Sequence, residues 1–309
     1  MDYIKGFTYG FDSKKGDFLK PAAKKSLQLL KDRTAINTVI IALAALQDTA
    51  QSVEIDYTGA HMVSDHELIA MINYAQSLGL QVILKPMVNV RNGTWRAFIN
   101  FFEHDVPCEP KWSEWFASYT LYQAHYARLA ELTQCKMLIV GCEMVQSEHR
   151  EQEWRNLLSV VRKHYRGLIS YNTDKYQEDR INWWDAVDVL SSSGYYPIND
   201  WEQQLSRIEK VVTKHNKPFF FAEAGCPSRS GSALLPNKWD LIGAVNLDEQ
   251  ASYYQTMFEK TKDKTWIKGF GLWDWSTLLD EQNQALANGR YSVLGKPAEK
   301  IIRDFYQSF

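Results

Sequence analysis

The sequence predicts an α/β fold, a single (β/α)8 TIM barrel that takes up residues 1–309. The chain has 309 residues, of which 45% are hydrophobic, and this length and composition suit one barrel with a large core. Eight short apolar runs recur along the chain, and helical stretches with one apolar face separate them. Because no Pro- or Ser-rich joint interrupts the alternation, we expect one domain.

The predicted strands are short runs rich in Val, Ile, Leu and Phe that lack strict alternation of apolar and polar residues. Parallel strands buried on both faces have this pattern. In chain order they are Gly6–Phe11, Thr38–Ala44, Gln81–Pro86, Lys136–Gly141, Gly167–Tyr171, Val187–Ser192, Pro218–Ala222 and Gly269–Trp273.

Amphipathic helical stretches lie between these runs. The clearest are Asp65–Leu78, Trp112–Leu132, Gln152–His164, Trp201–His215 and Glu249–Thr261. Ser64 and Glu67 have the spacing of a capping box, which predicts the start of the first of these helices. Gly79 is placed to end it.

The charge balance excludes several classes of partner. With 35 basic and 37 acidic residues and no Lys/Arg-rich run, the chain lacks the electrostatic signature of a protein that binds nucleic acid or an anionic membrane surface. No apolar stretch approaches the ~20 residues that span a bilayer. The N-terminus lacks the charged and apolar regions of a signal peptide, so we expect a cytoplasmic protein. The four cysteines show no C-x-x-C spacing, which favours reduced, packed thiols.

Two glutamates are the strongest candidates for chemistry. Glu143 and Glu223 each follow directly on an apolar run, and residues at the carboxyl ends of barrel strands face the substrate. A carboxylate at such a position is costly unless it has a task. The other candidates at or near strand ends are Tyr9, Lys85, Asn89, Asn172, Tyr195, Tyr196, Trp273 and Trp275, together with Trp95 on a loop.

Paired carboxyl groups are what the hydrolysis of a glycosidic bond requires. One protonates the leaving oxygen, and the other attacks the anomeric carbon or activates water, with ~5–5.5 Å between them for retention and ~6.5–9.5 Å for inversion. Sugars present hydroxyl edges and flat C–H faces, which amides and aromatic rings can bind. We therefore expect an oligosaccharide ligand and no metal or other cofactor.

Other interpretations of these residues stay open. Both glutamates could be buried ion-pair partners of Arg or Lys. Lys85 could form a Schiff base, as lysines at barrel strand ends do in aldolases. Asp48, Asp174 and Asp274 could bind a divalent cation, although no metal-ligand spacing supports this.

Several segments resemble glycoside hydrolase family 113, whose described members are β-mannanases, within clan A of the glycoside hydrolases. The similar segments are Leu84-Lys85-Pro86, Gly93-Thr94-Trp95-Arg96, Gly141-Cys142-Glu143, Gly194-Tyr195-Tyr196-Pro197, Glu223-Ala224-Gly225-Cys226-Pro227-Ser228 and Trp273-Asp274-Trp275. They cover the chain from the third strand to the last.

The resemblance implies a retaining double displacement with Glu143 as general acid/base and Glu223 as nucleophile. A hydroxyl from Tyr195 or Tyr196 could hold the nucleophile ionised. Trp273 and Trp275 share a face by the alternation of side chains along a strand, and one of them would form the floor of the subsite of the cleaved sugar. Lys85 and Asn89 would bind sugar hydroxyls.

One position departs from the pattern of the clan. An asparagine usually precedes the acid/base glutamate and contacts the sugar 2-hydroxyl, whereas this chain has Cys142 there. We expect Asn172 to supply that contact instead, since 2-hydroxyl contacts tighten in the transition state.

The resulting prediction is a catalytic domain that cleaves β-1,4-mannosidic bonds in mannan-derived oligosaccharides. The alternatives are a clan A hydrolase acting on β-glucosides or β-galactosides, and a catalytically idle barrel that binds glycans. The sequence leaves open endo or exo action, transglycosylation and oligomeric state.

Overall fold

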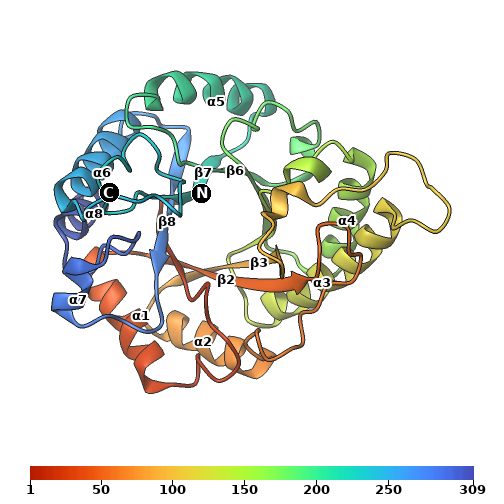
Figure 1. The fold of residues 1–309 in the computed structure, drawn as a ribbon, viewed down its shortest axis with the longest axis horizontal. Helices are drawn as coiled ribbons and strands as arrows, with labels where there is room; N and C mark the ends of the chain where they lie inside the picture. Colours follow the sequence, from red (N-terminus) through yellow and green to blue (C-terminus); the bar gives the residue numbers. More distant parts are fainter.

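The computed structural model describes residues 1–309, apart from the side chain of Gln282, and forms a closed barrel of eight parallel strands (Figure 1). Each strand pairs with its neighbours in chain order, and β8 pairs with β1 to close the ring. The strands are β1 (Ile4–Tyr9), β2 (Thr38–Gln47), β3 (Gln81–Val90), β4 (Met137–Cys142), β5 (Leu168–Thr173), β6 (Val189–Ser193), β7 (Phe219–Ala224) and β8 (Ile267–Trp275). The predicted fold class is confirmed.

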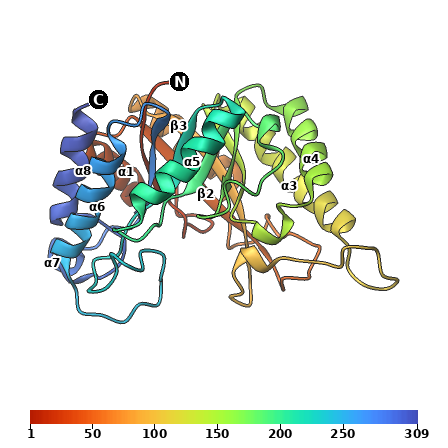
Figure 2. The same cartoon turned by 90° about the horizontal axis from the view of Figure 1, so that it is seen from above.

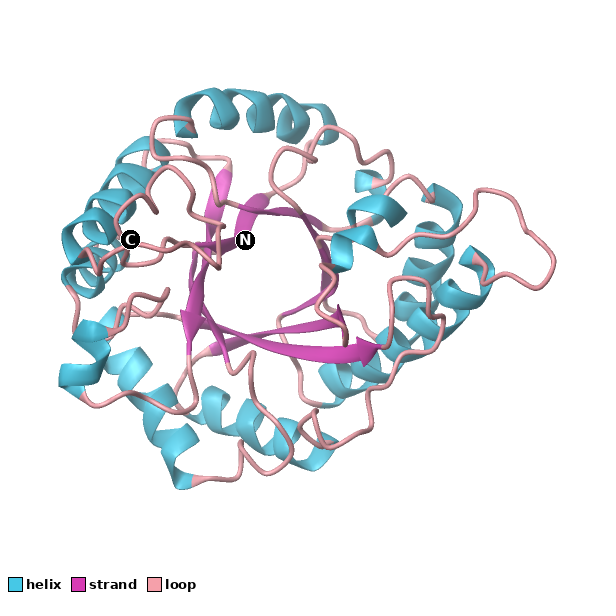
Figure 3. Cartoon of the chain, viewed as in Figure 1, coloured by secondary structure: helices cyan, strands magenta, loops and turns pink.

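Helices surround the ring of strands on its outside (Figure 3). They are α1 (Pro21–Thr34), α2 (Asp65–Ser77), α3 (Trp112–Leu132), α4 (Glu151–His164), α5 (Trp201–His215), α6 (Leu247–Thr261), α7 (Gln282–Ala287) and α8 (Pro297–Gln307). The predicted capping box is present: the Ser64 hydroxyl accepts from the Glu67 amide, and the Glu67 carboxylate accepts from the Ser64 amide. In the described chain no α-helix lies between β5 and β6, and a short 3-10 helix at Trp184–Ala186 takes its place.

Strand β3 runs farther than predicted, to Val90 instead of Pro86. It stays in register with β2 as far as Gln47 and Val90, whereas its pairing with β4 is confined to Ile83 and Leu84. Beyond that point, side chains of α3 form hydrogen bonds with carbonyl groups of β3. The Gln123 amide donates to the Pro86 carbonyl, and the Tyr122 hydroxyl donates to the Met87 carbonyl. Strands β3 and β4 therefore do not pair with each other at the carboxyl end of the barrel.

The core has two layers. A small cluster of buried side chains from the strands, including Ile40, Ile139 and Phe220, fills the barrel interior. A larger cluster lies between the barrel and its helices and contains most of the buried tryptophans, such as Trp115 and Trp154. The layers match the expected packing of a barrel that is filled with side chains rather than hollow.

The two ends of the barrel differ. Both termini lie at one end, and the long β3–α3 and β7–α6 loops project from the opposite end (Figure 2). Those loops follow the carboxyl ends of strands, the end at which barrel enzymes carry their active sites. In the described part of the chain, no helix combines the length and apolar character needed to cross a bilayer.

Candidate active site

Glu143 directly follows β4 in an unusual backbone conformation. Its φ angle is 54°, in the left-handed region that residues other than glycine rarely adopt and that is concentrated at functional sites. The backbone is fixed there because its amide donates to the Asn172 carbonyl at 2.8 Å. The residue is 7% exposed, and it lines a cleft at this end of the barrel.

Three donors hold the Glu143 carboxylate. The Ser193 hydroxyl donates to Oε1 at 2.7 Å. The Arg96 guanidinium donates to Oε2 at 2.9 Å, and the Trp95 indole N–H approaches the same oxygen at 3.3 Å. The carboxylate is thus oriented by β6 on one side and by the β3–α3 loop on the other.

Glu223 lies within β7 and is 3% exposed. The buried Lys85 ammonium donates to its Oε1, and the Cys142 thiol donates to the same oxygen at 3.3 Å. The Tyr195 hydroxyl donates to Oε2 at 2.9 Å. Burial raises the pKa of Glu223, but the charge and hydrogen bond of Lys85 outweigh it, so the pKa is held below its ordinary value.

The environment of Lys85 keeps it charged. Its side chain has no exposed surface, and its Nζ also donates to the Asn172 side-chain oxygen at 2.7 Å. Burial lowers the pKa of Lys85, and nearby anionic groups including Glu223 and Glu143 more than reverse this. A charged ammonium is not a nucleophile, which argues against Schiff-base chemistry.

The two glutamates face one cleft of about 520 Å³. Four of the predicted sugar-binding residues line it with them, namely Asn89, Trp95, Tyr195 and Trp273. Asn89 is fixed by Arg96, whose Nε and Nη2 donate to its side-chain oxygen at 3.1 and 2.7 Å. The structure therefore brings both predicted catalytic carboxylates together with aromatic surfaces and an amide.

Lys85 and Asn172 were expected to contact sugar, but both lie beneath the cleft, fully buried. Their polar atoms are occupied by protein groups: Lys85 binds Glu223 and Asn172, and the Asn172 amide donates to Thr173 and Ser193. The proposed contact between Asn172 and the sugar 2-hydroxyl is therefore corrected. Both residues support the carboxylates from below instead.

Tyr9, Tyr196 and Trp275 do not reach the cleft either. Tyr9 donates to the Ala23 carbonyl at 2.6 Å, and Trp275 donates to the Ser26 hydroxyl at 3.0 Å, so both face α1. Tyr196 donates to Glu178 and packs edge-on against Trp201. Of the two tyrosines after β6, it is Tyr195 that contacts the nucleophile candidate.

The different positions of Trp273 and Trp275 have a local cause. Phe7 pairs with Leu272, but Tyr9 pairs with Trp275, so β8 contains one more residue than β1 over this step. An extra residue reverses the alternation of side chains along a strand. Trp273 consequently faces the cleft while Trp275 faces the helices.

The sequence prediction missed three groups that contact the carboxylates: Arg96, Ser193 and Cys142. Two of them had a visible signal: Arg96 is a basic residue directly after Trp95 in the loop that follows β3, and Cys142 directly precedes Glu143. The Cys142 side chain is buried, and burial raises its pKa well above the ordinary value. It is therefore a neutral thiol that donates to Glu223.

The aspartates considered as metal ligands are dispersed. Asp174 lines the cleft, and burial together with the charge of Glu143 raises its pKa to about 7. Asp48 forms an exposed ion pair with Arg91. Among the described residues, no group of three or more His, Cys, Asp or Glu side chains is placed to hold a metal ion.

The model of Glycoside Hydrolase Family 113 matches residues 7–296 of the chain. The chain belongs to this family. The resemblance predicted from the strand-end motifs is confirmed, and the protein is a glycoside hydrolase. No curated protein matches the sequence.

Solved structures of family 113 are similar over the whole chain. A family 113 β-1,4-mannanase, solved as a complex, shares 65% identity over 100% of both chains with a TM-score of 0.99. The family 113 β-mannanase AaManA from Alicyclobacillus acidocaldarius, in complex with ManMIm, shares 40% identity over 100% of this chain and 98% of that one, with a TM-score of 0.96. A β-glucuronidase from Ruminococcus gnavus, at 13% identity and a TM-score of 0.66 over 99% of this chain and 50% of that one, shares the fold alone.

Proposed function

We propose that this family 113 enzyme hydrolyses β-1,4-mannosidic bonds in mannan-derived oligosaccharides, with retention of configuration, through a covalent glycosyl-enzyme. The observation that carries the proposal is the pair Glu143 and Glu223, which face one cleft with different hydrogen-bond partners. The choice of sugar and linkage is supported by the solved relatives, which are named β-1,4-mannanases.

Glu223 is suited to the role of nucleophile. Its carboxylate is kept ionised by Lys85, and Tyr195 fixes the orientation of Oε2. In the first step a carboxylate oxygen forms a bond to the anomeric carbon, and the bond from that carbon to the leaving oxygen breaks. The ester that results is the intermediate.

Glu143 is suited to the role of general acid and then general base. It gives its proton to the leaving oxygen as the first bond breaks, and it takes a proton from the water that hydrolyses the ester. Arg96 and Ser193 stabilise the carboxylate that exists between the two steps.

The aromatic groups position the sugars on either side of the cleaved bond. Trp273 and Tyr195 lie around Glu223 and would contact the sugar that forms the ester. Trp95 donates to Glu143 and is 41% exposed, so it would pack against the leaving sugar. Asn89, held by Arg96, would accept or donate one hydroxyl hydrogen bond nearby.

The roles can be tested with Glu143→Ala and Glu223→Ala, assayed on aryl β-mannosides and manno-oligosaccharides. Both variants should lose most activity, and azide should restore turnover by occupying the space of the missing carboxylate. Azide should yield the β-mannosyl azide with Glu143→Ala and the α-mannosyl azide with Glu223→Ala, because it attacks the ester in the first case and the substrate in the second.

The substrate can be tested separately with wild-type enzyme and a panel of aryl β-mannosides, β-glucosides and β-galactosides. NMR should detect the β-anomer of the mannose product before mutarotation. A preference for glucosides or galactosides would overturn the sugar assignment, and initial release of the α-anomer would overturn retention. Full activity of either alanine variant would overturn the catalytic pair.

A further inference from the structure

The backbone that carries Glu143 leaves its strand in an irregular way. Strand β4 contains one more residue than β5 over the last step of their pairing, since Ile139 pairs with Ser170 and Cys142 pairs with Asn172. An extra residue changes the face to which the following side chains point. Glu143 then has a φ angle of 54°, a conformation that persists only where the surrounding structure holds it.

The Tyr171 hydroxyl on β5 contacts both ends of the turn that follows Glu143. It accepts a hydrogen bond from the Met144 amide at 3.1 Å, and it donates to Glu148 Oε1 at 2.8 Å. Between these two residues the chain forms the 3-10 helix Val145–Ser147. A single hydroxyl therefore closes the turn at its first and last residues.

These contacts fix the backbone on both sides of the Glu143 Cα atom. The Glu143 amide, in the preceding peptide plane, donates to the Asn172 carbonyl at 2.8 Å. The Met144 amide, in the following peptide plane, donates to Tyr171. Because peptide units are planar, holding the planes on both sides of a residue fixes its φ and ψ angles. The direction of the Glu143 side chain is thus set by two neighbouring residues of β5.

The Tyr171 ring is itself held in one position. It packs edge-on against Trp154 with 4.9 Å between ring centroids, and the Trp183 ring lies 4.9 Å from it. Gly141 leaves room for the ring, because a Cβ atom at that position would lie 2.8 Å from the Tyr171 Cε2 atom. The hydroxyl oxygen therefore cannot move far from the Met144 amide.

Glu148 determines the direction of the Tyr171 O–H bond. A tyrosine hydroxyl has one hydrogen, so donation to Glu148 leaves a lone pair of the oxygen free to accept from the Met144 amide. The Thr173 hydroxyl donates to the same Oε1 at 2.7 Å, and the Trp183 indole donates to the Glu148 carbonyl at 2.9 Å. Both ends of Glu148 are thereby fixed.

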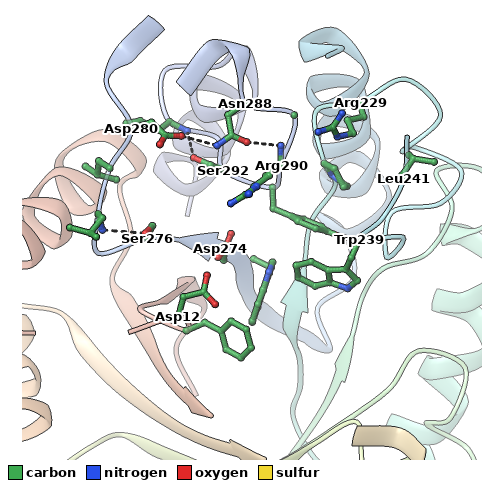
Figure 4. Close-up of a pocket in the computed structure, with 18 of the residues that line it drawn as sticks. Asp12, Arg229, Trp239, Leu241, Asp274, Ser276, Asp280, Asn288, Arg290 and Ser292 are labelled. Carbon is green, nitrogen blue, oxygen red and sulfur yellow. Dashed lines mark hydrogen bonds between the residues drawn. The ribbon is translucent and has the colours of Figure 1, made fainter. Parts of the chain in front are cut away.

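The groups behind Glu143 are closed to solvent, unlike the other side of the site. There a cavity of about 650 Å³ opens at the ends of β8 and β1, and Figure 4 shows charged side chains such as Asp274 in it. Tyr171, Met144 and Glu148 are 0%, 1% and 4% exposed. If the hydroxyl is removed, the Met144 amide therefore loses its partner in a place where water cannot readily replace it.

We propose that Tyr171 is a positioning residue for proton transfer by Glu143, and that Glu148 orients the Tyr171 hydroxyl for this task. This inference rests on the proposed function, which makes Glu143 the general acid/base, and it deepens that function. Tyr171 is buried and acts through the peptide unit after Glu143, which it holds so that the carboxyl group stays directed at the leaving oxygen. A displacement of about 1 Å at such a group can cost about a hundred-fold in rate.

The test exploits the difference between leaving groups that need a proton and leaving groups that do not. Dinitrophenolate departs without a proton, whereas phenolate departs faster when an acid protonates it. The comparison is kcat/KM on dinitrophenyl β-1,4-mannobioside and on phenyl β-1,4-mannobioside, which reports the steps up to formation of the ester. Tyr171→Phe should lower the phenyl value about ten- to a hundred-fold and the dinitrophenyl value less than about threefold. Glu143→Ala should give the same split, with a larger loss.

Three further variants test the roles of the individual groups. Glu148→Leu removes the acceptor of the Tyr171 hydroxyl and should reproduce the split between the two substrates. Glu148→Gln keeps an oxygen for that hydroxyl and should retain the wild-type ratio. Tyr165→Phe is the matched control, because the buried Tyr165 hydroxyl donates to the Cys135 carbonyl at 2.6 Å at the opposite end of β4 and β5. It should leave the ratio unchanged.

The outcomes separate the positioning role from the proposed function. If Glu143→Ala shows the split and Tyr171→Phe loses equally on both substrates or loses nothing, the positioning role is overturned and the proposed function stands. If Glu143→Ala loses equally on both, Glu143 is not the acid and both proposals fail. A thermal unfolding scan shows whether each variant folds. If Tyr171→Phe does not fold, Glu148→Leu decides, and a wild-type ratio in that variant overturns the positioning role.

Discussion

Lys85 and Glu223 form an ion pair at the base of the cleft, and the lysine has no exposed surface. The lysine does not contact the cleft, so its effect on the reaction passes through the carboxylate. It compensates the charge of Glu223 in a place where water cannot do so, and it thereby sets the protonation state of the proposed nucleophile.

Replacing Lys85 should therefore shift the pH dependence of activity. As the proposed nucleophile, Glu223 must be ionised to attack, and its lowered pKa keeps it ionised as the pH falls. In Lys85→Met the pKa of Glu223 rises, so the acidic limb of the kcat/KM profile should move to higher pH. The profile with an aryl mannobioside measures this, and an unchanged acidic limb would contradict the role of the lysine.

The same substitution should also lower stability. Removing one partner of a buried pair leaves an uncompensated charge and costs about 3–5 kcal/mol. Lys300→Met is the matched control, because Lys300 pairs with Asp304 on the surface of α8 and an exposed pair contributes less than about 1 kcal/mol. Urea unfolding of the two variants at pH 7 measures the difference in the free energy of unfolding.

Tyr195 and Tyr196 offer a comparison between adjacent residues. Tyr195→Phe removes a hydrogen bond to Glu223 and should lower kcat/KM about ten- to a hundred-fold with little change in stability. Tyr196→Phe removes a buried hydrogen bond to Glu178 and should lower the free energy of unfolding by about 1–3 kcal/mol while kcat stays near wild type. The reverse pattern in kinetics and thermal unfolding would show that the two residues have been assigned the wrong way round.

Glu148 should make stability fall as the pH rises. Burial raises its pKa from 4.5 to about 8, although Tyr171 and Thr173 donate to it. Between these two values the folded chain keeps the proton while the unfolded chain releases it, so the contribution of this group to stability declines across that window. Glu148→Gln does not titrate. Its free energy of unfolding, relative to wild type, should therefore increase between pH 5 and pH 8 in a urea series.

The cysteines should differ sharply in reactivity. Cys108 is exposed, whereas Cys135, Cys142 and Cys226 are buried, and burial raises the pKa of each of these three thiols. A disulfide reagent should therefore modify one thiol per native chain quickly and all four after unfolding. Activity should survive the fast phase, because Cys108 is not in the cleft. Rapid inactivation would contradict the shielded position of Cys142.

The sequence was most informative about the strands and the two glutamates. All eight predicted runs overlap strands of the barrel, because parallel strands buried on both faces are continuous apolar runs that can be recognised in the sequence. Glu143 and Glu223 could be placed at strand ends for the same reason. The sequence did not indicate how deeply each side chain is buried. Lys85 and Asn172 lie on the predicted strands, but both are buried below the cleft.

Two further features were beyond the reach of the sequence pattern. The extra residue in β8 reverses the side-chain alternation before Trp275, and such irregularities depend on pairing with a neighbouring strand rather than on composition. Arg96 reaches Glu143 from a loop, and the path of a loop is set by packing across the barrel rim. No periodicity in the sequence encodes either one.

The base of the cleft contains two cations, Lys85 and Arg96, and two carboxylates, Glu223 and Glu143. Together they are electrically balanced when both carboxylates are ionised. Esterification of Glu223 removes one negative charge, so during the lifetime of the proposed intermediate Glu143 faces an excess of positive charge. In the proposed mechanism Glu143 is the group that takes a proton from the attacking water at this stage. The formation of the ester thus changes the charge around the proposed base.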